Sequence, residues 1–373
     1  PLTQRVIRRV LTTHHRRALG ERMVHNELSS ILADLSPDVV NVHNLHKASD
    51  QSWSAELVTT CAKHAPTVWT LHDMWSFTGR CAYSYECKKY LTGCDSGCPT
   101  PEEHPPLAPE RIAEAWNNRR RQLRERPTLV AVAPSLWLAR EAKEGLWGDH
   151  RVHVIPYGVP LDVHVPVDRH VARRSLGLDT SGPVILMAAE FLEDRRKGGH
   201  LLAQAMPRLS RRPITIITFG NGRLSLRVGD VHLRELGFVE DEQTKVLAYS
   251  AADVFVHPAP VDNLPNVVME SIACGTPVVA FAIGGLPDLV RPGITGWLCN
   301  AVSSEDLAVT LECALDEISS GADLRESCRM VAETEYCSSL QAKRYLDLFH
   351  ALLKEGRHDR LVAEPGKGCQ KTG

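Results

Sequence analysis

Short apolar runs rich in β-branched residues alternate with amphipathic stretches along most of this chain. In the first half, the apolar runs predict buried strands, and the stretches between them have the spacing of helices. Such alternation is typical of a parallel sheet with crossover helices. The predicted strands are 38–42, 67–71, 129–133 and 152–157, and the predicted helices are about 21–35, 54–64, 110–124 and 136–147.

The second half repeats this pattern after a charged stretch, 164–182, which is the predicted join between two domains. Its predicted strands are 184–189, 214–219, 254–257 and 277–281. The expected order is a first α/β domain at 1–163 with a cysteine-rich loop at 81–98, a second α/β domain at 164–340, a helix at 341–356 and a disordered tail at 357–373.

Length and composition agree with two ordinary domains. The 373 residues exceed the size of one common core, and 43% hydrophobic residues with a net charge of −2 indicate a folded globular protein. The chain has no run of about 18 apolar residues and no secretory signal. Its eleven cysteines lack the density of a disulfide scaffold. We therefore expect a cytoplasmic protein, and the near-neutral charge argues against a nucleic-acid partner.

The segment 262–279 carries the strongest helix start in the chain. Asp262 and Asn263 can cap a helix, Pro265 suits its first turn, and Gly275 ends it. The first N–H groups of such a helix, together with its dipole, favour a negatively charged ligand. The backbone amides in question belong to Asn266, Val267 and Val268.

Glu270 lies one helical turn after Asn266, on the same face. A phosphate could rest on the amides while Glu270 accepts hydrogen bonds from neighbouring hydroxyls. This pattern predicts a site for a nucleoside diphosphate sugar.

The spacing Asp262–x7–Glu270, the following SIACGTPVV and the upstream DRRKGG at 194–199 together resemble a known signature. It is the E-x7-E signature of retaining glycosyltransferases of the GT-B fold, in the large family 4 that includes sucrose synthase and bacterial polysaccharide enzymes. Asp262 stands where most relatives have glutamate. The run at 72–87 and DNLPN are most similar to the colanic-acid and exopolysaccharide subgroup. The resemblance implies two Rossmann-like domains facing a cleft, with the last helix returning to the first domain.

The resemblance assigns catalytic roles to cations and carboxylates of the second domain. Arg196 and Lys197 would stabilise the negative charge that grows on the leaving diphosphate. Because Arg195 is adjacent, the register of the arginine stays open, and a solvated charge run is the alternative. Asp262 would lie near the hydroxyls of the transferred sugar, unless it only caps the helix, and Glu270 would bind the ribose.

Further residues follow predicted strands. His72 would lie beside the donor sugar, with a histidine packed in a turn as the alternative. His43 and His46 could meet the acceptor, and for them a packed histidine is an equal alternative. Gly237 and Phe238 resemble the segment whose backbone contacts the nucleotide base. The pair at 284–285 would form another loop of close backbone approach, with ordinary turn glycines as an equal alternative.

The resemblance also implies a mechanism. The acceptor hydroxyl would enter on the face from which the diphosphate leaves, so the anomeric configuration is retained, and no cofactor or divalent metal is required. The expected acceptor is a carbohydrate or a lipid-linked hydroxyl in cell-surface polysaccharide synthesis. The basic segments 5–22 and 119–126 could rest on an anionic membrane; solvated helix faces are the alternative.

Four cysteines lie in one loop, at Cys81, Cys87, Cys94 and Cys98. Four close thiols in a cytoplasmic protein suit a structural zinc ion. The spacing is not that of paired CxxC knuckles, so disulfide or redox pairs and unliganded thiols remain as alternatives.

The family's first strand and glycine-rich turn have no counterpart before the strand at 38–42. We expect a fragment that lacks this βα unit, or a protein that has lost it. The missing unit makes a non-catalytic nucleotide-binding remnant one alternative function. Another GT-B enzyme, a nucleotide-sugar epimerase, is a second alternative, although RRKGG and the Asp262–Glu270 pair argue against it.

Overall fold

The computed structural model describes residues 13–46, 54–178, 182–210, 213–226 and 229–363. The chain divides into two compact units, each with its own parallel sheet and core. Unit 1 comprises Pro1–Ala133, Leu138–Ile155 and Lys343–Gly373, and unit 2 comprises Pro134–Trp137 and Pro156–Ala342.

Unit 1 contains a four-stranded parallel sheet in the order β1-β2-β3-β4. Strands β2 and β3 are buried at every position: β3 is a continuous apolar run, and β2 has two apolar residues between two threonines. The strands are β1 (Val40–Val42), β2 (Thr67–Thr70), β3 (Val130–Ala133) and β4 (Arg151–Val154). The helices are α2 (Thr13–Leu35), α3 (Glu56–His64), α4 (Lys89–Thr92), α5 (Pro109–Glu125) and α6 (Leu136–Glu144), with a 3-10 turn, η1 (Met74–Phe77).

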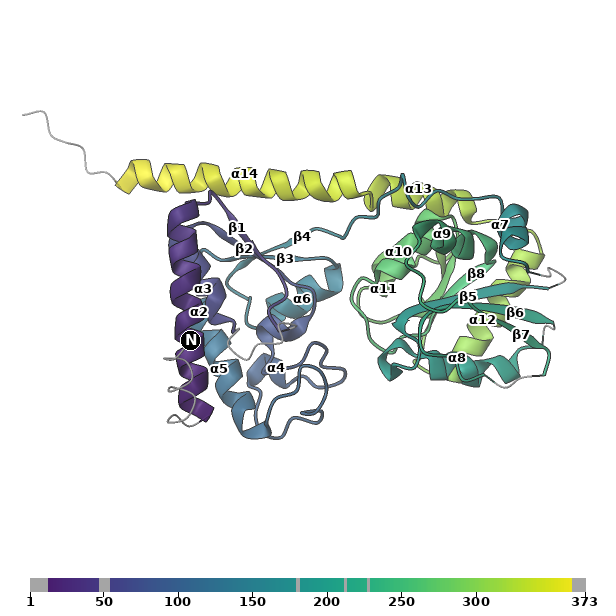
Figure 1. Cartoon of the computed structure of the whole chain (residues 1–373), viewed down its shortest axis with the longest axis horizontal. Helices are drawn as coiled ribbons and strands as arrows, with labels where there is room; N and C mark the ends of the chain where they lie inside the picture. The colour runs from purple at the N-terminus through teal and green to yellow at the C-terminus, as the bar shows by residue number, and fades with distance from the viewer. Residues whose placement is uncertain (1–12, 47–53, 179–181, 211–212, 227–228, 364–373) are drawn as a thin grey trace, which may run out of the picture. The chain divides into compact units, whose positions relative to one another are not determined.

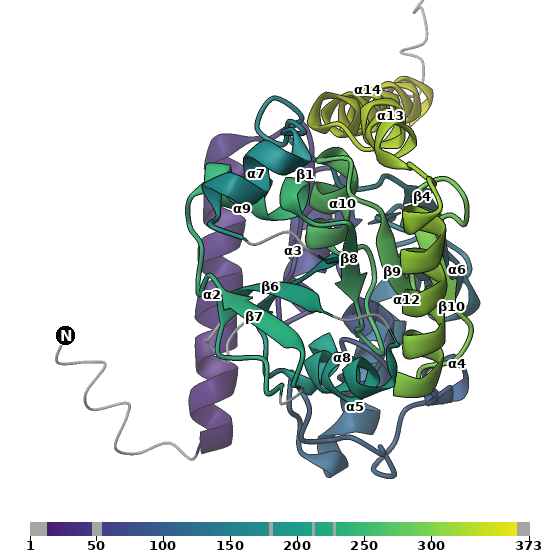
Figure 2. The same cartoon turned by 90° about the vertical axis from the view of Figure 1, so that its right-hand side faces the viewer.

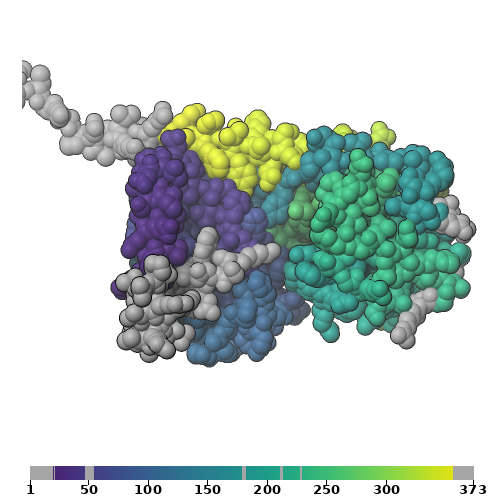
Figure 3. Space-filling view, in the orientation of Figure 1, coloured from purple at the N-terminus to yellow at the C-terminus, as the bar shows by residue number. Residues whose placement is uncertain are grey.

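The C-terminal helix α14 (Ser338–Ala363) completes the core of unit 1. Leu348 and Leu352 are buried in one cluster with Val68, Val130 and other residues of the sheet. Tyr345 and Thr70 form a hydrogen bond of 3.0 Å between their hydroxyls. Figure 3 shows α14 in yellow beside the purple and blue atoms of unit 1. The last described helix therefore belongs to the hydrophobic core of the first sheet.

Unit 2 contains a six-stranded parallel sheet in the order β10-β9-β8-β5-β6-β7. Its strands are β5 (Val184–Phe191), β6 (Ile214–Asn221), β7 (Val231–Glu235), β8 (Val254–His257), β9 (Val278–Phe281) and β10 (Gly296–Cys299). Its helices are α7 (Arg169–Ser175), α8 (Gly199–Ala205), α9 (Glu242–Ala251), α10 (Asn266–Ala273), α11 (Leu286–Leu289), α12 (Ser304–Ser319) and α13 (Arg325–Glu335), with the 3-10 turns η2 (Arg195–Lys197) and η3 (Met206–Arg208).

Helices cover both faces of the unit 2 sheet and form two separate cores (Figures 1 and 2). One core packs α7, α9, α10 and α13 against the sheet, and the other packs α8 and α12 against the opposite face. Because both faces are covered, the central strands β8 and β9 are buried at every position. The sheet is doubly wound, so the carboxyl ends of its strands meet at one edge.

All eight predicted strands are present, and two further strands, β7 and β10, were missed. The sequence of β7, Val-His-Leu-Arg-Glu, has polar and charged residues because it forms an exposed edge of the sheet. The four-residue strand β10 is short and begins with glycine. Helix α2 begins at Thr13, before the predicted start at residue 21.

Two predicted boundaries were wrong. The units divide after Ile155, whereas the join was expected at 164–182. That stretch instead packs in unit 2, where Val167 contacts the core and Arg173 forms an ion pair with Asp253. The tail was expected to be disordered from residue 357, but α14 continues to Ala363; positions 364–373 lie outside the described residues. No helix in the described ranges has an apolar stretch long enough to cross a membrane.

Candidate functional site

The carboxyl edge of the unit 2 sheet carries the predicted site residues of the second half. Turn η2 follows β5, Asp262 follows β8, and Gly284 follows β9, three strands that lie beside one another in the order β9-β8-β5. Ligands of open α/β sheets bind at this edge, because the loops after the strands converge there. The structure thus brings Lys197 and Asp262 together although 65 positions separate them.

Asp262 is the centre of a buried polar cluster. Its Oδ2 accepts a hydrogen bond from Nζ of Lys197 at 2.8 Å and lies 3.2 Å from Nε2 of His257. Its Oδ1 accepts the backbone N–H of Asn263 at 3.0 Å. Only 6% of Asp262 is exposed, and His257 is buried at the end of β8. Burial and these three contacts fix the orientation of the carboxylate.

The protonation states follow from this environment. Burial lowers the pKa of His257, which outweighs the hydrogen bond and negative charge of Asp262, so the imidazole is neutral. Burial alone would raise the pKa of Asp262, but the hydrogen bond from His257 and the charge of Lys197 hold it well below its ordinary value. The cluster therefore consists of a neutral imidazole, a carboxylate and an ammonium group.

Two glycines allow the loops of this cluster to pack backbone against backbone. Gly198 has φ +73°, and a Cβ there would lie 1.7 Å from the carbonyl oxygen of Pro258. Gly284 has φ +55°, and its Cβ would lie 1.9 Å from the carbonyl oxygen of Asp262. Any side chain would separate these loops. The expected close-approach loop at 284–285 is therefore confirmed, with the Asp262 backbone as its neighbour.

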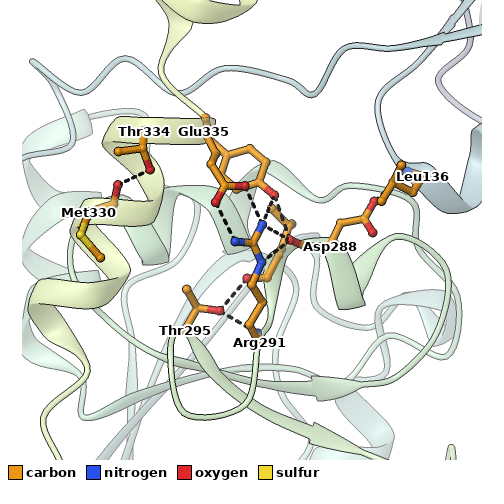
Figure 4. A network of polar contacts seen from close by, with 9 residues as sticks. Leu136, Asp288, Arg291, Thr295, Met330, Thr334 and Glu335 are labelled. Atoms are coloured by element: carbon orange, nitrogen blue, oxygen red, sulfur yellow. Dashed lines mark hydrogen bonds and ion pairs between the residues drawn. The ribbon is translucent and has the colours of Figure 1, made fainter.

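The loop after Gly284 continues into α11, which a polar network holds in place (Figure 4). Arg291 forms two hydrogen bonds of 2.6 Å with the carboxylate of Glu335 and donates to the carbonyl of Asp288. The side chain of Asp288 accepts the backbone N–H of Leu136 at 2.7 Å. The hydroxyl of Tyr336 also donates to the Asp288 carbonyl. The bidentate pair of Arg291 and Glu335 therefore helps to hold α11 and the loop before it in place.

Arg196 and Lys197 point to different partners. Nη2 of Arg196 lies 3.1 Å from Oδ2 of Asp194, its neighbour in the same turn, and 40% of the arginine side chain is exposed. Lys197 is only 20% exposed and contacts Asp262. Of the two predicted cations, Lys197 is therefore the one built into the buried cluster.

Helix α10 begins one residue after Pro265, and its predicted caps were wrong. Asp262 contacts Lys197 and His257 instead, and the side chain of Asn263 accepts a 2.5 Å hydrogen bond from Oγ of Ser135. The N-cap is Pro265, with no side-chain hydrogen bond to the helix. A proline N-cap offers no side-chain acceptor to the first N–H groups of the helix, and such N–H groups can bind an anion.

The three predicted amides of this turn differ. The N–H of Val268 donates to the carbonyl of Pro265 at 3.1 Å, and its side chain is buried in the core. Asn266 is exposed and Val267 is partly exposed, and the first N–H groups of a helix have no intrahelical acceptor. The amides of Asn266 and Val267 are therefore the better candidates for phosphate contact.

Glu270 is half-buried one turn further along α10. Its Oε2 accepts a hydrogen bond of 2.8 Å from the hydroxyl of Tyr249, on α9. An exposed surface glutamate would have no such buried partner. The predicted position of Glu270, on the face of Asn266 and beside the sheet edge, agrees with the structure.

Gly237 and Phe238 follow β7 at the same edge. Gly237 has φ +69°, and its carbonyl accepts the N–H of Gly220 at 2.8 Å. Phe238 is 59% exposed, so its ring is available to a ligand. Contact of these two residues with a nucleotide base stays a prediction.

Unit 1 gathers its predicted histidines at the carboxyl ends of β1 and β2. Nδ1 of His43 lies 3.0 Å from Nε2 of His72, and the rings are stacked at 5.3 Å. Nε2 of His46 lies 2.6 Å from Oδ2 of Asp73, which also caps η1. Burial lowers the pKa of His43. The HD pair at 72–73 therefore lies next to both histidines of the preceding strand end.

The prediction of a structural zinc site is not supported. No group of three or more histidine, cysteine, aspartate or glutamate residues within the described ranges could hold a metal ion. Burial raises the pKa of Cys81 and of Cys94 to about 11, so both are thiols, and the sulfur of Cys94 accepts the N–H of Gly79. Cys87 and Cys98 are also free.

Two buried arginines hold this loop in place of a metal. Nη1 of Arg119 donates to the carbonyls of Thr78 and Gly79, and its guanidinium lies 4.1 Å from the ring centre of Trp75. The Arg80 guanidinium donates to Oγ1 of Thr100 at 3.0 Å and to backbone carbonyls. Arg119 is only 7% exposed, so within the basic segment 119–126 only other arginines, such as the exposed Arg121 and Arg124, could face a membrane.

Sequence reasoning missed His257 and Tyr249, which hydrogen-bond the carboxylates of Asp262 and Glu270 respectively. A polar residue at the end of a buried strand, as in the run Val-Phe-Val-His, was the available signal for His257. Tyr249 had no signal, because a tyrosine on the apolar face of a helix is usually a core residue.

Comparison with known proteins connects both units to glycosyltransferases. Residues 182–317 match the family model described as Glycosyl transferases group 1, and residues 2–163 match the model described as Glycosyltransferase Family 4. A protein of Escherichia coli (strain K12) named as the colanic acid biosynthesis glycosyl transferase WcaC is 31% identical over 267 residues, which are 68% of this chain and 62% of that protein. A D-inositol 3-phosphate glycosyltransferase of Mycobacterium sp. (strain KMS) is 34% identical over 44% of this chain and 39% of its own length. The chain thus spans less than two thirds of these relatives.

Solved structures share the fold. Sucrose-phosphate synthase from Thermosynechococcus elongatus superposes with a TM-score of 0.68 at 19% identity, over 89% of this chain and 78% of the synthase. Anabaena Alr3699/HepE in complex with UDP-glucose superposes with a TM-score of 0.61 at 16% identity, over 87% of this chain and 82% of that protein. The two parallel-sheet α/β units have the architecture of GT-B glycosyltransferases, as predicted.

Proposed function

We propose that this chain, whose two units match two glycosyltransferase family models, is a retaining glycosyltransferase that uses a nucleoside diphosphate sugar. The carrying observation is the arrangement at the carboxyl edge of the unit 2 sheet. There the ion pair of Lys197 with the buried Asp262, and the start of α10 with Glu270 on its face, follow the neighbouring strands β5 and β8 of one sheet. This edge is where open α/β sheets bind nucleotides.

In this proposal the diphosphate rests on the first amides of α10, and Glu270 accepts hydrogen bonds from ribose hydroxyls. Lys197 stabilises the negative charge that develops on the leaving diphosphate, and Arg196 assists from the exposed side of the same turn. A divalent metal is not needed for this step. Asp262 holds Lys197 in position, and its carboxylate lies where the transferred sugar would approach.

The acceptor hydroxyl enters on the face from which the diphosphate departs, so the new bond has the anomeric configuration of the donor. The role of His72 as a contact of the donor sugar is proposed from the resemblance of His72 and Asp73 to the HD motif of the family. We propose a carbohydrate or lipid-linked acceptor in polysaccharide synthesis, since the matched WcaC relative is named for colanic acid biosynthesis. Peripheral binding to a membrane and a cytoplasmic location belong to the same proposal.

Calorimetric titration of UDP, GDP and ADP into the chain tests the donor site. We expect one nucleotide to bind, and Glu270→Ala to weaken that binding by about tenfold or more, because a charged hydrogen-bond acceptor is lost. Glu326→Ala, which removes an exposed glutamate on α13, is the matched control and should bind like the wild type. Absence of binding by all three nucleotides would refute the proposal.

Product analysis tests the reaction. With the bound nucleotide's α-linked sugar as donor, proton NMR of the product should show an α-linkage if the configuration is retained. A β-linked product would contradict a front-face reaction while leaving the glycosyltransferase assignment intact. An altered nucleotide sugar without transfer to any acceptor would identify an epimerase instead.

A further inference from the structure

Tyr249 is fully buried, and its hydroxyl contacts Glu270, the residue that is predicted to bind the ribose. It lies near the end of α9, has no exposed surface, and donates its hydroxyl proton to Oε2 of Glu270 at 2.8 Å. Burial, followed by the charge of Glu270, raises the pKa of Tyr249 well above its ordinary value. The hydroxyl therefore stays protonated and acts as a donor to the carboxylate.

The tyrosine ring is held rigidly. Phe219, on strand β6, packs edge-on against it at 5.6 Å between ring centres. Phe255, on strand β8, lies at 5.8 Å from it, again between ring centres. The carbonyl of Tyr249 accepts a hydrogen bond of 2.7 Å from Oγ1 of Thr276, just after α10. Aromatic rings have few rotamers, and packing on two sides leaves this one a single position. The hydroxyl is thus a fixed point from which the carboxylate is oriented.

Because of this contact, the two carboxylate oxygens of Glu270 have different roles. A carboxylate accepts hydrogen bonds at both oxygens, and Oε2 takes the buried tyrosine proton. Oε1 is then the oxygen left to accept hydrogen bonds from a ligand, and Glu270 is only half-buried. An acceptor oriented in this way recognises a pair of neighbouring hydroxyls better than a freely rotating one does, because less entropy is lost on binding.

We infer that Tyr249 is a positioning residue for Glu270 and that it sets the preference of this site for ribonucleotides over nucleotides without ribose hydroxyls. The inference rests on the proposed function, in which Glu270 binds the ribose. Tyr249 itself touches no ligand.

The test compares Tyr249→Phe with the wild type for UDP, GDP and ADP and for the 2′,3′-dideoxy form of each. We expect the variant to bind the cognate nucleotide about tenfold more weakly and its dideoxy form with unchanged affinity. The ribo-to-dideoxy affinity ratio should therefore fall about tenfold. Tyr90→Phe is the matched control, because this tyrosine is 1% exposed and hydrogen-bonds the carboxylate of Glu141 in unit 1. It should keep the wild-type ratio.

A second substitution separates positioning from general loosening of the fold. In the Glu270→Ala background, Tyr249→Phe should leave the ribo-to-dideoxy ratio unchanged, because the group that it positions is gone. If Tyr249→Phe weakens both forms equally, or changes the ratio without Glu270, the inference is overturned while the donor site stands. If the wild type binds none of the nucleotides, the proposed function fails and the inference fails with it.

Discussion

At the scale of single residues, Asp262 is the most constrained side chain of the site. Lys197, His257 and the backbone of Asn263 occupy its carboxylate. Aspartate is one methylene shorter than the glutamate common in the resembling family, so its carboxylate remains close to the strand end. Because the Asp262 side chain is short and has these three partners, it is suited to holding Lys197 in position.

Replacement of Lys197 tests that division of roles. Lys197→Met keeps the length of the side chain but removes the charge, so we expect kcat for sugar transfer to fall by roughly 100-fold or more. Arg196→Met should have a smaller effect, because that arginine is more exposed and pairs within its own turn. Lys245→Met, which removes a lysine paired with Glu242 in α9, is the control. Equal losses of kcat in Lys197→Met and Lys245→Met would contradict the role assigned to Lys197.

His257 should make stability depend on pH. Its pKa in the folded chain is below the ordinary 6.5, so the unfolded chain binds more protons near neutrality and stability declines as pH falls through about 6.5. The depressed pKa of Asp262 adds a further loss only in strong acid. His257→Gln can still donate to Asp262 but cannot titrate. Between pH 6.5 and 5, we expect the free energy of unfolding of His257→Gln to depend less steeply on pH than that of the wild type, by at most about 1.4 kcal/mol per pH unit.

Chemical denaturation at several pH values measures this profile. His350→Gln, at an exposed position of α14, should keep the wild-type slope. An unchanged slope in His257→Gln would show that the buried imidazole does not contribute.

At the scale of elements, the site depends on loops that touch through their backbones. Gly284 meets Asp262, and Gly198 meets Pro258, at distances that exclude a Cβ. The turn after each strand is therefore positioned by its neighbour, and the sheet order sets which loops can meet.

Gly284→Ala should destabilise unit 2 by about 3 kcal/mol or more, because left-handed strain adds to a clash with the Asp262 carbonyl. Gly293→Ala is the matched control. Gly293 has φ +75°, but a Cβ at this position would meet no other atom within 4 Å, so only about 1 kcal/mol of strain is expected. Denaturant titration compares the two variants, and equal effects would mean that the loop contact relaxes without penalty.

Sequence patterns revealed most of these elements. Buried parallel strands such as β3 and β9 are continuous apolar runs, and the signature around Asp262 and Glu270 pointed to the carboxylate pair. The edge strand β7 was not predictable, since its exposed positions are polar. The zinc prediction is not supported, because cysteine spacing does not show how the thiols are placed in space, nor that the buried Arg80 and Arg119 bind the backbone of this loop. Tyr249 could not be assigned, because its partner Glu270 comes from another helix, whereas the end of strand β8 gave a signal for His257.

At the scale of the whole molecule, each unit has its own core, so a nucleotide should act on unit 2 first. At 100 times its Kd, a ligand stabilises the region that binds it by about 2.7 kcal/mol. We expect hydrogen exchange to slow in the segments 194–198 and 262–270 of unit 2 and to remain unchanged in the loop 81–98, because that loop belongs to unit 1, which has a core of its own. Equal protection of both regions would contradict this localisation.

Helix α14 has a practical consequence for dividing the chain. A recombinant piece ending at Ile155 would contain every strand of the first sheet, yet it would lack Leu348 and Leu352, which share a core with Val68 and Val130. Exposed apolar sheet surface promotes aggregation. A folded form of unit 1 should therefore carry residues 343–363, joined through a linker. A stop codon near position 342 would accordingly disrupt unit 1, although most of this unit is encoded at the start of the chain.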